Sequence, residues 1–128
     1  MTEKITIIAE AGVNHNGKIN LAYKLIDIAA RSKADYVKFQ ITNADLITKK
    51  AKKANYQIND NKKETQHEMI KKLEMDWRKI NPLLIEYSKK RKINFLTTAF
   101  DINGLNHLKK LKFKTYKVPS GEIINHPY

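Results

Sequence analysis

The apolar and polar positions along this chain predict strands that alternate with helices. Residues 5–8 are apolar β-formers, which predicts a buried strand that ends at Glu10. Residues 19–31 carry apolar side chains at the three- and four-residue spacing of one helical face, which predicts an amphipathic helix. Residues 35–40 alternate with a period of two, which predicts a second short strand. The chain therefore begins with a predicted strand, helix and strand.

The same alternation continues after a long interruption. Residues 41–76 are rich in lysine and asparagine and contain one short amphipathic run, and connections of this length often form a lid over a site. The pattern then predicts a helix over 76–91, a third strand over 93–98, a third helix over 102–111 and a fourth strand over 115–118. The residues expected to cap the second and third helices are Asp76 and Asp101.

Strands joined by helical crossovers are typical of a parallel sheet. A complete (β/α)8 barrel takes about 250 residues, whereas this chain has 128 residues. We therefore predict an α/β fold, namely an incomplete TIM barrel with roughly the first four strands and their helices. Residues 1–128 are expected to form one truncated domain, the amino-terminal half of such a barrel.

Composition narrows the class of protein to which the chain belongs. It has 25 lysines and arginines against 13 acids, a formal charge of +12, which favours an anionic partner. Many lysines fall on predicted helix faces, where solvent explains them, and only 9% of the residues are aromatic, so we expect no nucleic-acid partner. The absence of cysteine and of any apolar stretch near the roughly 20 residues of a membrane span predicts a cytoplasmic protein without a membrane partner.

Polar side chains are predicted at the carboxyl end of every strand. Because ligands of parallel α/β folds bind at these ends, where the loops converge, we expect the side chains to share one rim. Two lysines, a threonine and a serine suit a phosphate or carboxylate anion, whereas two glutamates suit proton transfer or a hydroxylated partner. These rim residues are Glu10, Lys38, Gln40, Thr98, Lys117, Ser120 and Glu122.

Other chemical motifs are sparse. The histidines are not spaced as the ligands of a zinc site, and His15 is the one that we place in a loop of the rim. The chain has neither the glycine-rich phosphate and dinucleotide motifs nor the nucleophile elbow of serine hydrolases. The strand-end residues therefore carry the functional prediction.

Five stretches that span nearly the whole chain form a pattern typical of one enzyme family. They are IAEAGVNHNG (8–17), VKFQ (37–40), ETQ (64–66), FLTTAFD (95–101) and YKVPSGE (116–122). In this order they resemble the sialic acid synthase family, the synthases of N-acetylneuraminate and related nonulosonic acids. The first and the last stretch are long and fairly specific.

The resemblance implies the start of a (β/α)8 barrel that condenses phosphoenolpyruvate with an N-acetylmannosamine-type sugar, releases phosphate and uses a divalent metal, manganese or magnesium. It implies phosphoenolpyruvate contacts at Lys38, Thr98, Lys117 and Ser120. It also implies sugar contacts at Gln40 and Glu122, and catalytic acids at Glu10 and Glu122.

The sequence departs from the family in one turn and in length. Proline is common in the family where Ala99 stands, which leaves the geometry of that turn open. The family takes its metal-binding histidines from later strands, adds an asparagine and a serine to the phosphoenolpyruvate site, and carries an antifreeze-like domain that reaches into the partner's site in a homodimer. We therefore expect the metal ligands to lie beyond residue 128 and the chain to be inactive alone.

The residues leave two other functions open. The charge of +12 also suits a non-catalytic, basic anion-binding module. The strand-end pattern also suits another phosphoenolpyruvate-using or aldolase-type barrel enzyme. Within the resemblance, the acceptor sugar is either N-acetylmannosamine or a diacetamido-dideoxy relative.

Overall fold

A three-stranded parallel sheet forms the centre of the computed structural model, which describes residues 5–47, 49–58 and 63–128. The strands lie in the order β1 (Ile8–Gly12), β2 (Tyr36–Gln40) and β3 (Asn94–Thr98). The helices are α1 (Ile19–Arg31), α2 (Gln66–Leu73), α3 (Trp77–Lys90) and α4 (Ile102–Lys110), and three short 3-10 turns cover Ala44–Leu46, Asn55–Gln57 and Ser120–Glu122.

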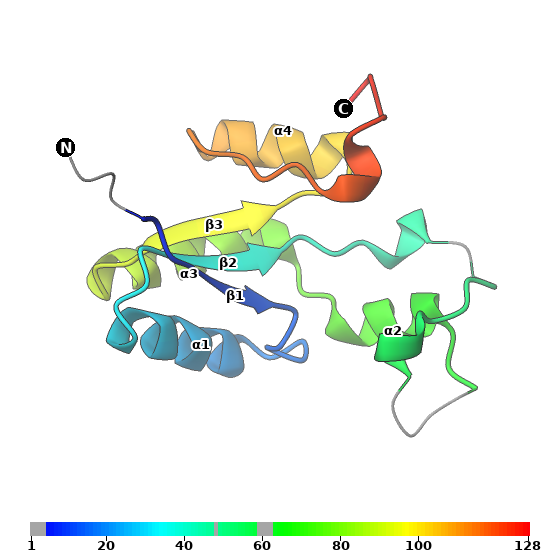
Figure 1. Cartoon of the computed structure of the whole chain (residues 1–128), viewed down its shortest axis with the longest axis horizontal. Coiled ribbons are helices and arrows are strands. Elements are labelled where there is room, and N and C mark those ends of the chain that lie inside the picture. Colours follow the sequence, from blue (N-terminus) through cyan, green and yellow to red (C-terminus); the bar gives the residue numbers. More distant parts are fainter. Residues whose placement is uncertain (1–4, 48, 59–62) are drawn as a thin grey trace.

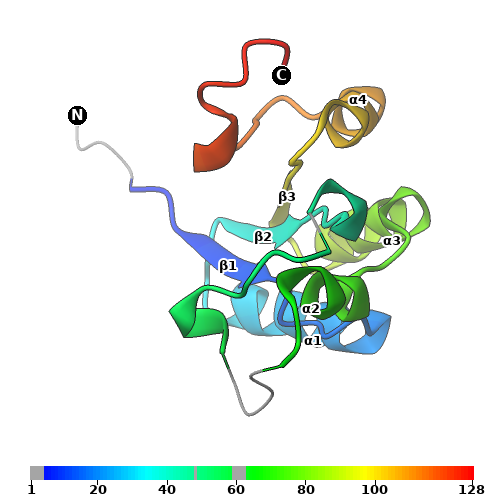
Figure 2. The ribbon, with the colours of Figure 1, turned by 90° about the vertical axis from the view of Figure 1, so that its right-hand side faces the viewer.

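Helices α1 and α3 cover one face of the sheet (Figure 2). The predicted alternation in β2 explains this, because Val37 and Phe39 are buried toward the helices while Tyr36, Lys38 and Gln40 are only half-buried on the other face. The main apolar core joins these two strand residues to Ile26 of α1 and Leu84 of α3. Polar side chains of the strands are thus left for the open face.

Each of the helices α1, α3 and α4 ends in a turn with a lysine in the left-handed region. Lys33, Lys92 and Lys112 have φ angles of +57°, +56° and +60°. After each lysine, the next N–H donates to the carbonyl five residues earlier, which is the hydrogen bond of a Schellman motif. These three bonds run from Ala34 to Ala29 (3.2 Å), from Ile93 to Ser88 (3.1 Å) and from Phe113 to Leu108 (3.2 Å).

The predicted helix caps are confirmed in position. Asp101 Oδ1 accepts a hydrogen bond of 2.5 Å from the Gly104 N–H at the start of α4. Asp76 occupies the N-cap position of α3, but its carboxylate forms an ion pair with Lys79 (3.3 Å) and accepts no cap hydrogen bond. The amphipathic run predicted inside 41–76 is α2, which begins with a reciprocal capping box between Thr65 and Glu68.

The long connection lies beyond the carboxyl ends of the strands, where Figure 1 shows α2. Residues 48 and 59–62 of the predicted lid lie outside the described residues. Within the described ranges, no helix is both long and apolar enough to cross a membrane.

The first strand begins later than predicted. β1 covers Ile8–Gly12, so it leaves out most of the apolar run at 5–8 and continues two residues past Glu10, where we predicted its end. Ile5, Ile7 and Ile8 are 79%, 54% and 46% exposed, which contradicts a buried strand. The physical reason is that β1 pairs with β2 alone and forms an edge of this sheet, so its apolar run has a neighbour on one side only.

The fourth strand predicted over 115–118 is absent from the described sheet. The segment returns past β3 (Figure 1), and the Phe113 ring contacts Phe95 with a centroid distance of 6.2 Å, but the backbone does not pair. A parallel strand needs both faces covered, whereas Tyr116 and Val118 are 40% and 50% exposed. The prediction is wrong for this structure because no covering layer lies over the segment in the described residues.

Candidate functional site

Three of the predicted rim residues meet on the open face of the sheet. The parallel register places Glu10 opposite Lys38, and the Lys38 ammonium forms an ion pair with Glu10 Oε2. Gln40 Nε2 donates a long hydrogen bond of 3.5 Å to Glu10 Oε1. The Lys38 side chain is 13% exposed and that of Glu10 is 48% exposed, so solvent reaches the pair through its acid. An anionic ligand could therefore take the place of the Glu10 carboxylate beside the ammonium.

Gly12 makes room for this group. The pairing of β1 is irregular between Glu10 and Gly12, and Gly12 has a φ of +53°. A Cβ at this position would lie 3.3 Å from Glu10 Oε1 and 3.6 Å from Gln40 Nε2. A side chain would thus strain the backbone and crowd both polar groups. The sequence pattern alone does not reveal this role of Gly12, because the role depends on the cross-strand register.

Thr98 lies next to this group, because the register places it opposite Gln40. It is 2% exposed, and its hydroxyl has no hydrogen-bond partner among the described residues. The Thr97 hydroxyl also has no partner among the described residues, although Thr97 points to the face that the helices cover. An unpartnered hydroxyl alone is therefore not evidence of a ligand contact. The face that Thr98 shares with Lys38 and Gln40 is what makes it a candidate.

Lys117, Ser120 and Glu122 lie on the segment after α4. Lys117 and Ser120 are exposed, and within the described ranges no hydrogen bond or ion pair joins any of the three to Glu10, Lys38 or Gln40. Figure 1 shows the turn Ser120–Glu122 just beyond the carboxyl end of β3. The structure therefore brings four predicted rim residues together, and in the described residues the other three have no hydrogen bond or ion pair to Glu10, Lys38 or Gln40.

Tyr128 ties this last segment to the end of β3. Its hydroxyl donates to the Ala99 carbonyl at 3.1 Å. Burial raises the pKa of Tyr128, and the charges of Glu122 and Asp101 raise it further. Glu122 also accepts a hydrogen bond of 2.5 Å from the Asn125 amide. These contacts fix the Glu122 turn near the strand end that carries Thr98.

His15 is not the exposed rim residue that its loop suggested. It is 2% exposed, its Nδ1 accepts a hydrogen bond of 3.1 Å from the Gly17 N–H, and its ring lies 6.2 Å from that of Phe39. Burial lowers the pKa of His15 below its ordinary value. His15 is therefore a neutral core residue near pH 7, and it lies under the end of β2.

The connection over 41–76, which we predicted as a lid, makes contacts within itself and with the loop after β1. Glu64 Oε2 pairs with Lys53 at 3.0 Å and Glu64 Oε1 pairs with Lys72 at 2.6 Å, and the two lysines, Lys72 first, lower the pKa of Glu64. Gly17 approaches the end of α2 so closely that a Cβ would lie 2.8 Å from the Lys72 carbonyl oxygen. Helix α2 thus packs against the loop that follows β1.

The described residues do not form a metal site by themselves. No group of three or more histidine, aspartate or glutamate residues within the described ranges could hold a metal ion. The acid of the site, Glu10, faces a lysine, which is a poor environment for a cation. We therefore assign no metal ligand among the described residues, and the manganese or magnesium ion stays a prediction of the resemblance.

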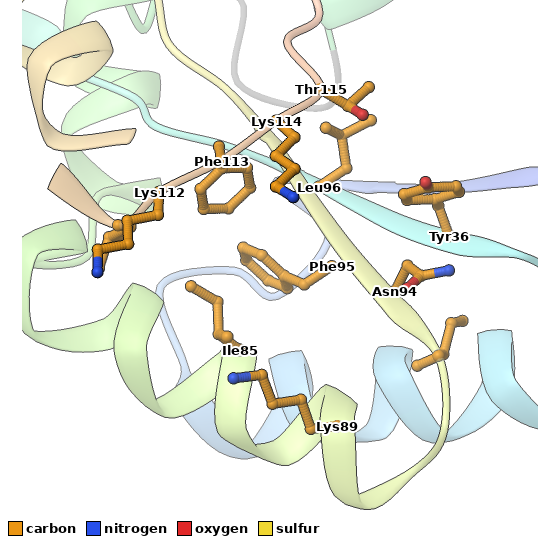
Figure 3. Close-up of a pocket in the computed structure, with 12 residues that line it drawn as sticks. Tyr36, Ile85, Lys89, Asn94, Phe95, Leu96, Lys112, Phe113, Lys114 and Thr115 are labelled. Atoms are coloured by element: carbon orange, nitrogen blue, oxygen red, sulfur yellow. The ribbon is translucent and has the colours of Figure 1, made fainter. Parts of the chain in front are cut away.

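A separate cleft of about 330 Å3 lies along the amino-terminal half of β3 (Figure 3). Phe95 and Phe113 face each other across it, and its charged groups belong to Lys89, Lys112 and Lys114, which are all exposed to solvent. Ligands of parallel α/β folds bind at the opposite ends of the strands. We therefore place the candidate site at the Glu10–Lys38–Gln40 group and not in this cleft.

Comparisons with known proteins agree with the resemblance drawn from the sequence. N,N'-diacetyllegionaminic acid synthase of Campylobacter jejuni subsp. jejuni serotype O:2 is 53% identical over 131 residues, which cover 98% of this chain and 38% of that protein. The protein of the same name from Legionella pneumophila subsp. pneumophila is 47% identical over 124 residues, covering 95% of this chain and 35% of that protein. The chain therefore spans less than two fifths of the curated relatives that it matches.

Solved structures agree with the predicted fold. The crystal structure of N-acetylneuraminic acid (sialic acid) synthetase from Leptospira borgpetersenii serovar Hardjo-bovis, in complex with citrate, matches with a TM-score of 0.76 and 36% identity, over 96% of this chain and 39% of that chain. The prediction of an incomplete TIM barrel is confirmed, with three described strands rather than four. Residues 25–128 match the NeuB family, and the chain belongs to that family.

Proposed function

We propose that this chain forms one wall of the active site of a nonulosonic acid synthase, which condenses phosphoenolpyruvate with an N-acetylmannosamine-type sugar and releases phosphate. The observation that carries the proposal is the Glu10–Lys38–Gln40 group on the open face of the sheet. The relatives are named as synthases of diacetyllegionaminic and sialic acids, which supports the same class of product. Because the chain spans only part of those relatives, the activity is proposed for the complete gene product.

In this proposal, four residues hold phosphoenolpyruvate. The ligand carries a phosphate and a carboxylate, and the Lys38 ammonium neutralises one of them while the unpartnered Thr98 hydroxyl donates a hydrogen bond. Lys117 and Ser120 add a second ammonium and a second hydroxyl from the segment beyond β3.

The remaining residues act on the sugar. A carbon–carbon bond must form between the methylene carbon of phosphoenolpyruvate and the aldehyde carbon of the sugar, whose oxygen takes a proton. Water must add at the carbon that bears the phosphate, and the bond from that carbon to the phosphate oxygen then breaks to release phosphate. When an anion pairs with Lys38, Glu10 is released from its ion pair and becomes free to orient a sugar hydroxyl or to move a proton. Gln40, which faces Glu10, and Glu122, which stands beyond β3, would bind the sugar hydroxyls, and Glu122 is the second candidate for proton transfer.

The identity of the acceptor sugar is a separate part of the proposal. Both relatives named N,N'-diacetyllegionaminic acid synthase are more similar to this chain than the sialic acid synthetase of known structure, at 53% and 47% against 36% identity. We therefore propose a diacetamido-dideoxy sugar as the acceptor, in preference to N-acetylmannosamine. We also propose that the complete gene product acts as a homodimer, as the family resemblance implies.

The test is phosphate release by the complete gene product, supplied with phosphoenolpyruvate, manganese and each of the two sugars. We expect release that depends on the sugar and is faster with the diacetamido sugar. Absence of release with every N-acetylhexosamine would contradict the proposal. Tight, salt-dependent binding of short DNA without any preference for phosphoenolpyruvate would instead favour a basic anion-binding module.

A further inference from the structure

A small, partly open cavity of about 20 Å3 lies under the end of β2. Three parts of the fold meet around it, namely the loop after β1, the end of β2 and the first turns of α3. Most of its wall is apolar, with Phe39 and Leu84 among the lining residues. The polar residues that line it are His15, Gln40, Thr42 and Asn81.

Two of these polar residues bring hydrogen-bond donors to the cavity. His15 uses Nδ1 to accept from the Gly17 N–H, so Nε2 carries the proton of its neutral ring. Asn81 is 4% exposed, and its Nδ2 has no partner among the described residues. The Asn81 amide is a buried donor that needs an acceptor, because buried polar groups are nearly always hydrogen-bonded. His15, itself 2% exposed, lines the same cavity and can donate to the same acceptor.

The size of the cavity limits what the acceptor can be. One water molecule needs about 10–15 Å3 of such volume, and the cavity offers about 20 Å3. The oxygen of one water accepts two hydrogen bonds, which matches the two donors. One of its own protons can be donated to the Thr42 hydroxyl, since Thr42 lines the same cavity.

We propose that one buried water molecule fills this cavity, that it accepts hydrogen bonds from His15 Nε2–H and the Asn81 amide, and that His15 thereby positions the end of β2. Gln40 is the last residue of β2 and faces Glu10 in the candidate site. His15 is thus a positioning residue that acts on the site through the water. The expected effect on the sugar, but not the water itself, rests on the proposed function.

A high-resolution crystal structure of the complete gene product tests the water directly. We expect one ordered water within hydrogen-bond distance of His15 Nε2 and Asn81 Nδ2. A dry cavity, or a direct hydrogen bond between the two side chains, would overturn the proposal. This outcome does not depend on activity, so it separates a failure of the water site from a failure of the proposed function.

The positioning role is tested with His15→Leu and His15→Gln. Leucine removes the donor, whereas the glutamine amide can still donate into the cavity. We expect His15→Leu to raise the KM for the sugar about tenfold, the effect of a displaced hydrogen-bonding group, with little change in the KM for phosphoenolpyruvate, and His15→Gln to restore most of it. If His15→Leu does not fold, Asn81→Leu against Asn81→Gln gives the same comparison. Equal effects of the apolar and the amide variants, or an equal rise in both KM values, would overturn the role.

Discussion

The two ends of the sheet both carry lysines, but they hold them in different ways. At the carboxyl end, Lys38 is 13% exposed, pairs with Glu10 and lies beside a glycine that leaves room for the acid. At the amino end, Lys33, Lys92 and Lys112 are exposed in the turns that follow α1, α3 and α4. A net charge of +12 does not indicate a function until the charges are placed. Of these four lysines, Lys38 is the one that is largely buried and held by an ion pair on the sheet.

Helix physics explains the lysines of the amino end without any partner. The last carbonyls of a helix carry partial negative charge, and a cation near them is stabilising. The left-handed position after a helix normally favours glycine, so each lysine there has a backbone cost that its charge can offset only in part. The cleft in Figure 3 belongs to this end, and its lysines contact solvent.

The largest expected effect is a loss of activity on substitution at the carboxyl end of the sheet, with no such loss at the amino end. Replacing Lys38 with alanine in the complete gene product should reduce kcat/KM by about 100- to 1,000-fold, because it removes a preorganised charge on the substrate anion. The matched control is Lys89→Ala, which removes an exposed lysine of the cleft and should change kcat/KM by less than about twofold. Steady-state phosphate release measures both. A similar loss of kcat/KM in both variants would show that the two ends of the sheet do not differ in function.

The next effect concerns the backbone that shapes the site. Gly12→Ala should lower the free energy of unfolding by about 1–3 kcal/mol, because alanine is strained at positive φ, and its Cβ would crowd Glu10 and Gln40. Gly121→Ala is the control, because a Cβ there meets nothing within 4 Å and its φ is not positive. Urea unfolding of both variants measures the difference. A Gly12→Ala protein as stable as the control would show that β1 does not have the described irregularity.

A smaller effect follows from the buried histidine under the site. The folded-state pKa of His15 is lowered by burial from its ordinary value of 6.5, so the unfolded chain binds a proton first as the pH falls. Stability is therefore complete above about pH 6.5 and declines as the pH falls from there toward the lowered pKa. His107, whose pKa is lowered by burial and then by Arg78 and Lys110, adds to the decline.

Urea unfolding between about pH 7 and pH 5 measures this decline, in a range above the ordinary pKa of the carboxylates. His15→Gln should flatten the pH dependence of stability, and His107→Gln should flatten the remainder. The lysines of the amino end keep their charge throughout this range. A pH dependence that survives both substitutions would place its source elsewhere in the molecule.

The smallest effect is expected at the amino end. Replacing Lys33, Lys92 or Lys112 with glycine should stabilise the protein by about 0.5–1 kcal/mol each, because glycine adopts the left-handed conformation without strain. The loss of a favourable charge at the helix end opposes this gain by a few tenths of a kcal/mol. Thermal unfolding measures the sum, and phosphate release should not change. A loss of activity in these variants would show that this end takes part in function.

The sequence predicted the parts of the fold that depend on local pattern. The alternation at 35–40 identified the faces of β2, and Asp101 identified the start of α4. The wrong predictions concern segments whose structure depends on long-range packing. The apolar run at 5–8 has the composition of a buried strand but lies on an edge, and 115–118 has the composition of a strand but no partner in the described residues.

The same division holds for the candidate site. The rule that parallel strands deliver ligand-binding groups at their carboxyl ends predicted that Glu10, Lys38 and Gln40 would meet, and this is confirmed. It did not predict that Gly12 makes room for them or that His15 is buried, because both facts depend on which side chains the register and α3 place beside them. The ligand roles of the rim residues, including Lys117, Ser120 and Glu122, stay predictions.

Hydrogen–deuterium exchange of the complete gene product with and without phosphoenolpyruvate is the most direct test of where the anion binds. We predict slower exchange in peptides that contain Glu10 to Gly12 and Lys38 to Gln40, and no change in those that contain Lys33, Lys92 or Lys112. Protection confined to the peptides of the amino end, around the cleft of Figure 3, would contradict the account.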